Sequence, residues 1–185
     1  MSSVKHQAYR YEPFPSNAFG GHHIRVLRLP PGAPDSPVRF ELLVRRLPHA
    51  EGTYEAVSCA WGNPNDTLEV ECLDGDGLPR LMLITRSLHS ALLRLRDTYR
   101  DRYLWADACC INQQDKLELG QQVAIMRSFY ALARRVLVWL GTDEEDVAED
   151  AVGLCVELYQ IIKENGKEFS QPTASEQDDL PNLFG

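Results

Sequence analysis

Two carboxylates and two amides lie close together in the sequence and could do chemistry. Asp107 is followed by the amides Asn112 and Gln113, and then by Glu118. Asp107 interrupts an apolar run, where an unpaired carboxylate would be costly, so it must have a polar partner. A carboxylate such as Glu118 can stabilise positive charge or act as a base, and amides can donate and accept hydrogen bonds.

Each of these residues also has a structural interpretation. Asp107 can hold a loop in place, and the two amides can cap helix ends. Asp115 with Glu118 matches a capping box, in which both acids stabilise the start of a helix. Gln122 lies one helical turn beyond Glu118 on the same face and would extend a site there. The residue types alone leave both interpretations open.

A second candidate binding segment is Trp61 with Gly62, at the end of an apolar run. An indole beside a permissive glycine backbone can stack on a planar ring, although a buried Trp over a tight turn fits the same pattern. Metal ions and cofactors are not expected, because the histidines and cysteines lack ligand spacing and no glycine-rich phosphate loop occurs. An odd number of cysteines without a Cys-x-x-Cys pair favours a reducing compartment.

The elements that position these residues follow from the hydrophobic periodicity. Alternation and turn residues predict strands at residues 24–29, 38–44, 54–62, 68–73 and 81–84, with the last two as a hairpin. A period near 3.6 predicts helices that begin at Thr85 or Ser87, at Asp115 and near residue 147, separated by buried strands at residues 103–111 and 135–140.

This order of elements predicts an α/β fold. Strands and helices alternate from residue 81 onward, which favours right-handed crossovers. We therefore expect three layers, with a mainly parallel central sheet flanked by helices, as in TIR or flavodoxin-like folds, and an added N-terminal β-rich segment. Ligands in such folds bind at the carboxyl ends of the strands. Those ends are residues 58–62, 107–113 and 140–143.

Composition and charge narrow the class of protein. The chain has 185 residues, 44% of them hydrophobic and 25% charged, which excludes a wholly disordered chain. The net charge of −8 is uneven, since residues 143–185 alone have a balance of −10 and the rest is near neutral. Without a basic stripe, a secretory signal or an apolar run of about 18 residues, we expect a cytoplasmic protein without a membrane span or a nucleic-acid partner.

Several ordered boxes resemble one family of fungal proteins. Residues 104–113 read Leu-Trp-Ala-Asp-Ala-Cys-Cys-Ile-Asn-Gln, against a family signature Leu-Trp-Ile-Asp-Ala-x-Cys-Ile-Asn-Gln. Residues 54–62 resemble a Tyr-x-Ala-Leu-Ser-Tyr-x-Trp-Gly box, and Val-Trp-Leu-Gly at 138–141 follows in the expected order. The chain thus resembles the heterokaryon-incompatibility (HET) domain of filamentous fungi over about residues 24–160. It departs from the pattern at Leu119, where the family has Arg after the glutamate.

The resemblance implies an effector domain in non-self recognition and programmed cell death, within proteins that carry sensing or regulatory regions. With the polar composition of both ends, the predicted organisation is an irregular lead-in (residues 1–23), a HET domain (24–164) and an acidic, flexible tail (165–185). The alternative is a non-enzymatic module that self-associates and signals with a regulatory protein partner, or an inactive truncated family member.

The family is distantly similar to Toll/interleukin-receptor (TIR) domains, some of which cleave NAD with the help of a glutamate. NAD would then be a substrate and not a cofactor. In that reading Glu118 stabilises the ribosyl cation, and the TIR comparison alternatively places the acid on the following helix, at Glu149 or Glu157. The remaining candidates orient the ribose and shape the base pocket, with Gln122 extending the site; they are Asp107, Asn112, Gln113, Trp61 and Gly62.

Overall fold

The computed structural model describes residues 7–15, 21–59, 63–142, 149, 152–154, 156–157 and 160. It contains two compact units, Met1–Thr142 and Asp143–Gly185. All the strands that the structure describes lie in the first unit. None of the helices within the described ranges is long and apolar enough to cross a bilayer.

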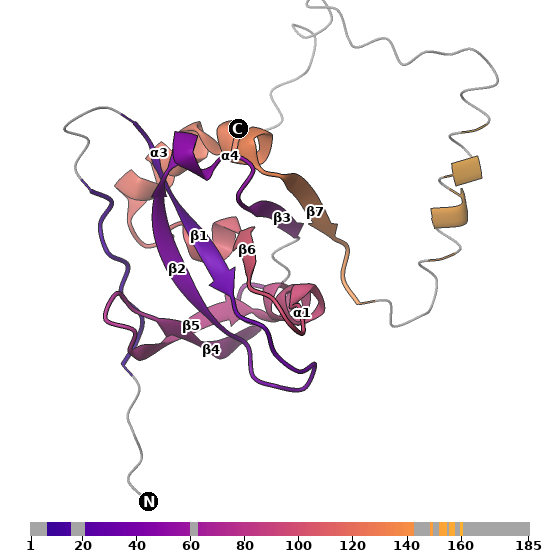
Figure 1. The fold of residues 1–185 in the computed structure, drawn as a ribbon, viewed down its shortest axis with the longest axis horizontal. Helices are drawn as coiled ribbons and strands as arrows, with labels where there is room; N and C mark the ends of the chain where they lie inside the picture. Colours follow the sequence, from indigo (N-terminus) through magenta and orange to yellow (C-terminus); the bar gives the residue numbers. More distant parts are fainter. Residues whose placement is uncertain are drawn as a thin grey trace, which may run out of the picture. The chain divides into compact units, whose positions relative to one another are not determined.

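The first unit is built on a seven-stranded sheet with the strand order β5-β4-β2-β1-β6-β3-β7 (Figure 1). The strands are β1 (His23–Leu29), β2 (Arg39–Arg46), β3 (Glu55–Cys59), β4 (Thr67–Leu73), β5 (Pro79–Thr85), β6 (Arg102–Trp105) and β7 (Arg135–Trp139). The helices are α1 (Arg86–Leu95), the single turn α2 (Asp107–Cys110), α3 (Lys116–Ala124) and α4 (Met126–Leu132), with a 3-10 turn η1 (Leu47–Ala50).

The sheet is mixed, so the expectation of a mainly parallel sheet is corrected. Strands β6, β3 and β7 are parallel to one another, and β2 is parallel to β4. Strand β1, however, runs antiparallel to both of its neighbours, β2 and β6. The β4–β5 hairpin is confirmed and places β5 at the sheet edge, so the strand-helix alternation after residue 81 does not start from a parallel strand.

Strand β1 forms the centre of the core because it is covered on both faces. Ile24, Val26, Leu27 and Leu29 are all buried, and so is Arg25 between them. Trp105 from β6 packs against Phe129 of α4, with ring centroids 5.1 Å apart. A strand with consecutive buried residues on both faces is typical of a central position.

The strand predicted at residues 103–111 is wrong beyond Trp105. Backbone direction changes at Ala106, and residues 107–110 form the helical turn α2. Cys109, Cys110 and Ile111 are nevertheless fully buried. A short apolar run that is buried all round does not distinguish strand from helix, because neither period leaves a polar face.

The predicted helix after Asp115 is confirmed at its start and interrupted at Ile125, where α3 gives way to α4. The helical period predicts a buried face with Leu119 and Val123; Leu119 packs against the core as predicted, but the most buried residues of α3 are polar. Glu118 and Gln122 are the buried residues of α3, whereas Leu117 is 73% exposed and Val123 is 50% exposed. The inward face of α3 is therefore polar, which points to a buried polar partner.

Residues 7–15 have no regular secondary structure apart from one bridge to β5. The backbone N–H of Tyr9 donates to the carbonyl of Leu81 at 2.8 Å, and the Leu81 N–H donates to Gln7 at 2.9 Å. The hydroxyl of Tyr11 donates to the carbonyl of Cys109 at 2.9 Å. This segment thus attaches to both β5 and α2.

In the second unit the described residues between 149 and 160 are helical, in agreement with the predicted third helix. Val152, Leu154 and Val156 are exposed there. The helical period predicts a buried face of Val147, Ala151, Leu154, Leu158 and Ile161. Leu154 is 57% exposed, so the prediction is wrong for this residue, and the other four lie outside the described residues.

Candidate functional site

The buried partner of α3 is Arg25 from β1. Its guanidinium contacts both carboxylate oxygens of Glu118, with Nη1–Oε1 at 2.5 Å and Nη2–Oε2 at 3.0 Å. The Arg25 side chain is 1% exposed and that of Glu118 is 10% exposed. Such a two-point contact, shielded from water, is the strong form of a salt bridge.

Both members of this ion pair also form hydrogen bonds with backbone groups of other segments. Glu118 Oε1 also accepts the Asn112 N–H at 2.8 Å, so it fastens the loop between α2 and α3. Arg25 donates to the carbonyl of Cys110 at 3.3 Å and to the carbonyl of Glu12 at 2.7 Å. The pair therefore joins β1, α2, the following loop and the N-terminal segment.

Aromatic rings complete the surroundings of the arginine. The guanidinium carbon of Arg25 lies 4.1 Å from the ring centroid of Phe14 and 5.0 Å from that of Tyr11. Burial is the main reason that the pKa of Tyr11 is raised well above its usual value, with a further contribution from Cys109. The phenol thus stays protonated and donates its hydrogen bond to α2.

The capping prediction for Asp115 is confirmed. Its side chain accepts the backbone N–H groups of Leu117 and Glu118, at 2.9 Å and 3.1 Å. Glu118, in contrast, does not fold back onto the cap as a capping box requires, since its two oxygens contact Arg25 and Asn112. The helix start is held by one acid, and the other acid points into the core.

Asn112 and Gln113 line a groove of about 430 Å³ together with Tyr9, Arg10 and Tyr11. Gln113 also has a structural contact, because its Nε2 donates to the carbonyl of Asp107 at 2.8 Å. The Asn112 side chain accepts the Gln114 N–H at 3.2 Å. The two amides thus shape the loop and border a groove of a size that small ligands use. Glu118 does not line this groove.

Asp107 begins α2, directly beyond the carboxyl end of β6, and is half-buried. Its Oδ1 accepts the N–H of Ala108 at 2.8 Å. Burial raises the pKa values of Cys59 and Tyr130, and the carboxylate of Asp107 raises both further. Asp107 is therefore electrostatically close to the carboxyl end of β3, where the segment with Trp61 and Gly62 follows.

Gln122 contributes to a different cavity, of about 480 Å³, beside Phe14, His22, His23 and Ile125. Its Nε2 donates to the carbonyl of His23 at 3.3 Å. Its Oε1 is buried without a hydrogen-bond partner among the described residues. Gln122 thus shares the inward face of α3 with Glu118 but does not border the groove of Asn112 and Gln113.

The structure brings some of the sequence candidates together and separates others. Asp107, Asn112, Gln113 and Glu118 surround one short loop, linked by the hydrogen bonds described above. Trp61 and Gly62 lie outside the described residues. Glu149 and Glu157 are helical and exposed, in the second unit. No group of three or more potential metal ligands occurs in the part of the chain that the structure describes.

Sequence reasoning missed Arg25. The alternating pattern around it predicts a solvent-facing arginine on a half-buried strand, and only the double burial of β1 reverses this. The sequence contains only an indirect indication that an arginine partner exists. Leu119 occupies the position where the family pattern has Arg, so a buried Glu118 needed a cation from elsewhere in the chain.

Comparison with known proteins supplies the family. The model of the family described as "Heterokaryon incompatibility protein (HET)" matches residues 54–180. Heterokaryon incompatibility protein 6, OR allele, of Neurospora crassa is 35% identical over 133 residues. That alignment covers 67% of this chain and 19% of the Neurospora protein, so the chain spans about a fifth of its relative. No solved structure matches the chain. The boxes around Asn112 and Glu118 fall within the matched region, and this chain belongs to the heterokaryon incompatibility (HET) family.

Proposed function

We propose that this chain is an effector domain in fungal heterokaryon incompatibility, where it promotes cell death after non-self recognition. The observation that carries this proposal is the family match over residues 54–180. The similarity to a Neurospora protein named for incompatibility supports the same biological role. The test is regulated expression of the chain in a filamentous fungus. Arrest of growth with loss of viability is expected, and unimpaired growth at high expression would contradict the proposal.

The proposed chemical activity is hydrolysis of NAD at the nicotinamide–ribose bond, at the carboxyl ends of β3 and β6. Within that proposal the two central carboxylates have different roles. Both oxygens of Glu118 are engaged by Arg25 and Asn112, so Glu118 is a positioning residue for the loop. Asp107 lies directly beyond β6 and near Cys59 and Tyr130, where it would face a developing ribosyl cation.

Nicotinamide release from NAD by the purified chain tests this assignment. Asp107→Asn is expected to abolish release while the protein stays folded. Glu118→Gln is expected to lower thermal stability together with activity. Glu157→Gln is the matched acid on the other unit and is expected to retain wild-type release. If Glu157→Gln alone abolishes release, the catalytic acid lies on the following helix and the assignment to Asp107 is wrong.

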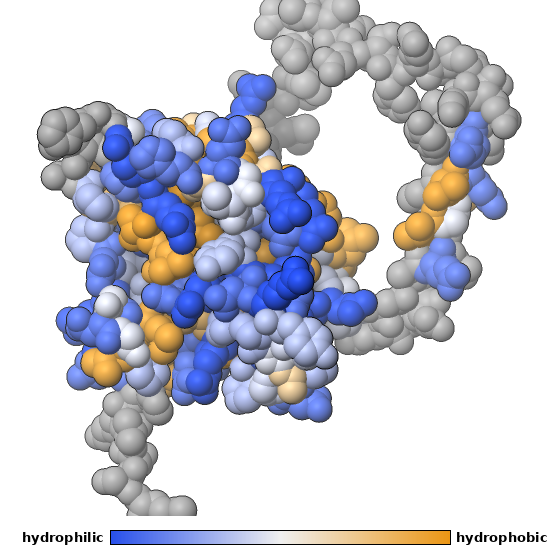
Figure 2. Space-filling model, in the orientation of Figure 1, coloured by the Kyte–Doolittle hydropathy of each residue, from blue (hydrophilic) through white to orange (hydrophobic). Residues whose placement is uncertain are grey.

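A second candidate function is signalling by self-association, which the sheet edge at β7 favours. On β7, Val136 is 45% exposed and Val138 is 66% exposed, and Leu140 just beyond is 90% exposed. Figure 2 shows hydrophobic surface where β7 ends. Since β7 is the last strand in the sheet order, one of its backbone edges has no strand neighbour among the described residues. Exposed apolar edge strands are a common template for pairing with another chain.

Light scattering on size-exclusion fractions distinguishes the two candidates. Mass that rises with protein concentration, is suppressed by Val138→Lys and is unaffected by Asp107→Asn would support assembly. A monomer at all concentrations that releases nicotinamide would support the enzyme. Arg135→Lys leaves the charge of the edge strand unchanged and serves as the control substitution.

A further inference from the structure

A second polar centre lies at the opposite ends of the same strands. Glu55, Arg102 and Arg135 are the first residues of β3, β6 and β7, which run parallel, so their side chains meet. Arg102 donates to Glu55 Oε2 through Nε at 2.9 Å and Nη2 at 2.6 Å. Arg135 Nε pairs with Glu55 Oε1. One carboxylate is thus shared by two guanidinium groups.

Beside this cluster is a cavity of about 450 Å³ between the end of α1 and the starts of β3, β6 and β7. It is unusually rich in arginine. Its lining includes the six residues Arg94, Arg96, Arg100, Arg102, Arg134 and Arg135, against three acids. The lining therefore has a formal charge of +3, although the unit as a whole is near neutral.

Each of the three acids of the lining has at least one carboxylate oxygen engaged by a partner. Glu55 pairs with Arg102 and Arg135. Asp97 Oδ1 accepts the backbone N–H groups of Tyr99 and Arg100 at 2.7 Å and 3.0 Å. Asp101 pairs with Arg28 at 3.5 Å. None of these acids forms a side-chain hydrogen bond or ion pair with the guanidinium groups of Arg94, Arg100 or Arg134.

Arg96 is structural as well, because its guanidinium donates to the carbonyls of residues 33, 34, 36 and 37. Arg94, Arg100 and Arg134 remain. No side-chain hydrogen bond or ion pair connects any of them to another of the described residues, and all three are exposed. Guanidinium groups are donors only, so these three have donors available for an acceptor from outside the chain, in exchange for water.

We infer that this cavity binds a diphosphate group. The guanidinium fork matches phosphate oxygens at two points, and Arg is the usual residue for such recognition. A diphosphate is a multiply charged anion at neutral pH, and the net positive lining of the cavity would attract it. The volume suits a small ligand rather than a polymer, and the basic residues line a cavity instead of a stripe. This inference does not depend on the proposed function, whose site lies at the other ends of the strands.

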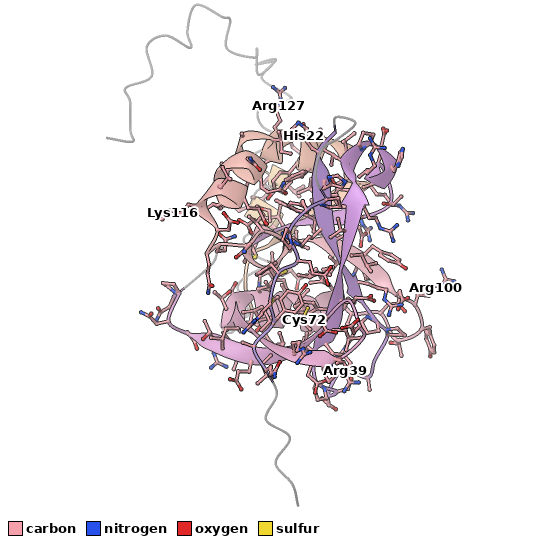
Figure 3. All side chains as sticks on the ribbon, turned by 90° about the vertical axis from the view of Figure 1, so that its left-hand side faces the viewer. His22, Arg39, Cys72, Arg100, Lys116 and Arg127 are labelled. Atoms are coloured by element: carbon pink, nitrogen blue, oxygen red, sulfur yellow. The ribbon has the colours of Figure 1, made fainter. Side chains whose placement is uncertain are left out.

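Calorimetric titration of the full chain tests the inference, with inorganic diphosphate, ADP and orthophosphate at low ionic strength. Saturable binding of one diphosphate per chain is expected, weakening with added salt. The variant Arg94→Ala/Arg100→Ala/Arg134→Ala is expected to weaken binding about a hundredfold, since it removes the uncommitted charge-assisted donors. Arg127→Ala is the matched control. Figure 3 shows Arg127 and Arg100 projecting outward from different parts of the molecule.

The relative affinities of the three ligands show which phosphate group the cavity binds. Equal affinity for ADP and inorganic diphosphate supports a site for the diphosphate alone, and tighter binding of ADP supports a nucleotide diphosphate. Binding of orthophosphate as tightly as diphosphate overturns the inference, as does an equal loss in Arg127→Ala. Absence of saturable binding by the wild-type chain overturns it too. The circular dichroism spectrum and melting midpoint of the triple variant are expected to match the wild type, and Arg134→Gln provides a single-site version that removes the charge but keeps a polar side chain.

Discussion

At the scale of single residues, the buried pair of Arg25 and Glu118 fixes the loop between α2 and α3, which we call the signature loop because it follows the family signature at residues 104–113. Taking both charges out of water is costly, and their attraction repays this cost only while both are present. Removing one partner leaves an uncompensated charge in the core. The pair therefore makes the loop between α2 and α3 dependent on β1, far away in the sequence.

Glu118→Gln is expected to lower the free energy of unfolding by about 3–5 kcal/mol, because Arg25 keeps its charge and loses its counterion. Urea unfolding monitored by tryptophan fluorescence measures the change. The matched control is Asp115→Ala, which removes only the helix cap and is expected to cost about 1 kcal/mol. The joint variant Arg25→Met/Glu118→Leu is expected to cost less than the sum of its single substitutions. Equal costs for Glu118→Gln and Asp115→Ala would show that the ion pair is not a core interaction.

Glu55 makes the stability of the sheet depend on pH. Burial alone would raise its pKa, but hydrogen bonds from Arg102 and Arg135 outweigh burial and hold the pKa below its usual value. A carboxyl group with a lowered folded-state pKa contributes stability above its unfolded-state pKa, and this contribution disappears as pH falls through the folded-state pKa.

Glu55→Gln is therefore expected to cost about 1–2 kcal/mol of unfolding free energy at pH 7 and progressively less below about pH 4.5. Denaturant titrations of both proteins across that range measure the difference. Glu41→Gln is a suitable control, since Glu41 pairs with Arg28 at the half-exposed surface of β2. A cost for Glu55→Gln that does not change with pH would contradict the assigned ionisation.

At the scale of elements, the sequence predicted the boundaries that local chemistry controls. The sequence predicts a start at Thr85 or Ser87 for one helix and at Asp115 for another. The side chains of Thr85 and Asp115 accept hydrogen bonds from the first turns of these helices. The turn around Asp74 joins β4 and β5 as predicted. The predictions that failed concern features that depend on residues far away in the sequence. The polar inward face of α3 exists because Arg25 of β1 lies opposite, and no local period reveals that.

The prediction of mainly parallel strands failed for the same physical reason. Alternating strands and helices indicate parallel pairing only if consecutive strands are neighbours or share one direction in the sheet. Here β5 and β6 are consecutive but separated by β4, β2 and β1. In the candidate site, the loop with Asp107, Asn112 and Gln113 could be placed from its position after a strand. Its connection to the N-terminal segment could not, because residues 7–15 show no periodicity.

The start of α1 permits a prediction at this scale, because the sequence offers two caps and the structure uses one. Thr85 Oγ1 accepts the Leu88 N–H at 3.3 Å. Thr85→Ala is expected to destabilise the chain by about 1 kcal/mol, and Ser87→Ala, inside the helix, by less than about 0.5 kcal/mol. Thermal unfolding of the two variants measures the contrast. A larger cost for Ser87→Ala would mean that the helix begins later than the structure places it.

At the scale of the whole first unit, the N-terminal segment (residues 7–15) covers the Arg25–Glu118 ion pair. Residues 7–15 bond to Leu81 at one sheet edge, cover Arg25 with Tyr11 and Phe14, and provide the Glu12 carbonyl as its acceptor. The hydroxyl of Tyr11 joins the same segment to α2. An irregular stretch thus links β5, β1 and the signature loop, which are separate elements of the sheet and its connections.

Deleting residues 1–15 is therefore expected to expose the Arg25–Glu118 pair to water and to lower the free energy of unfolding, on the order of 3 kcal/mol. Amide hydrogen exchange gives the sharper readout, because loss of cover over Arg25 should speed exchange between residues 110 and 118 more than in β4. Tyr11→Phe removes one hydrogen bond and is expected to produce a smaller effect on α2, whereas Glu12→Ala keeps the backbone carbonyl and is expected to be neutral. Unchanged exchange in the signature loop after the deletion would mean that Glu118 and Arg25 hold the loop without the N-terminal segment.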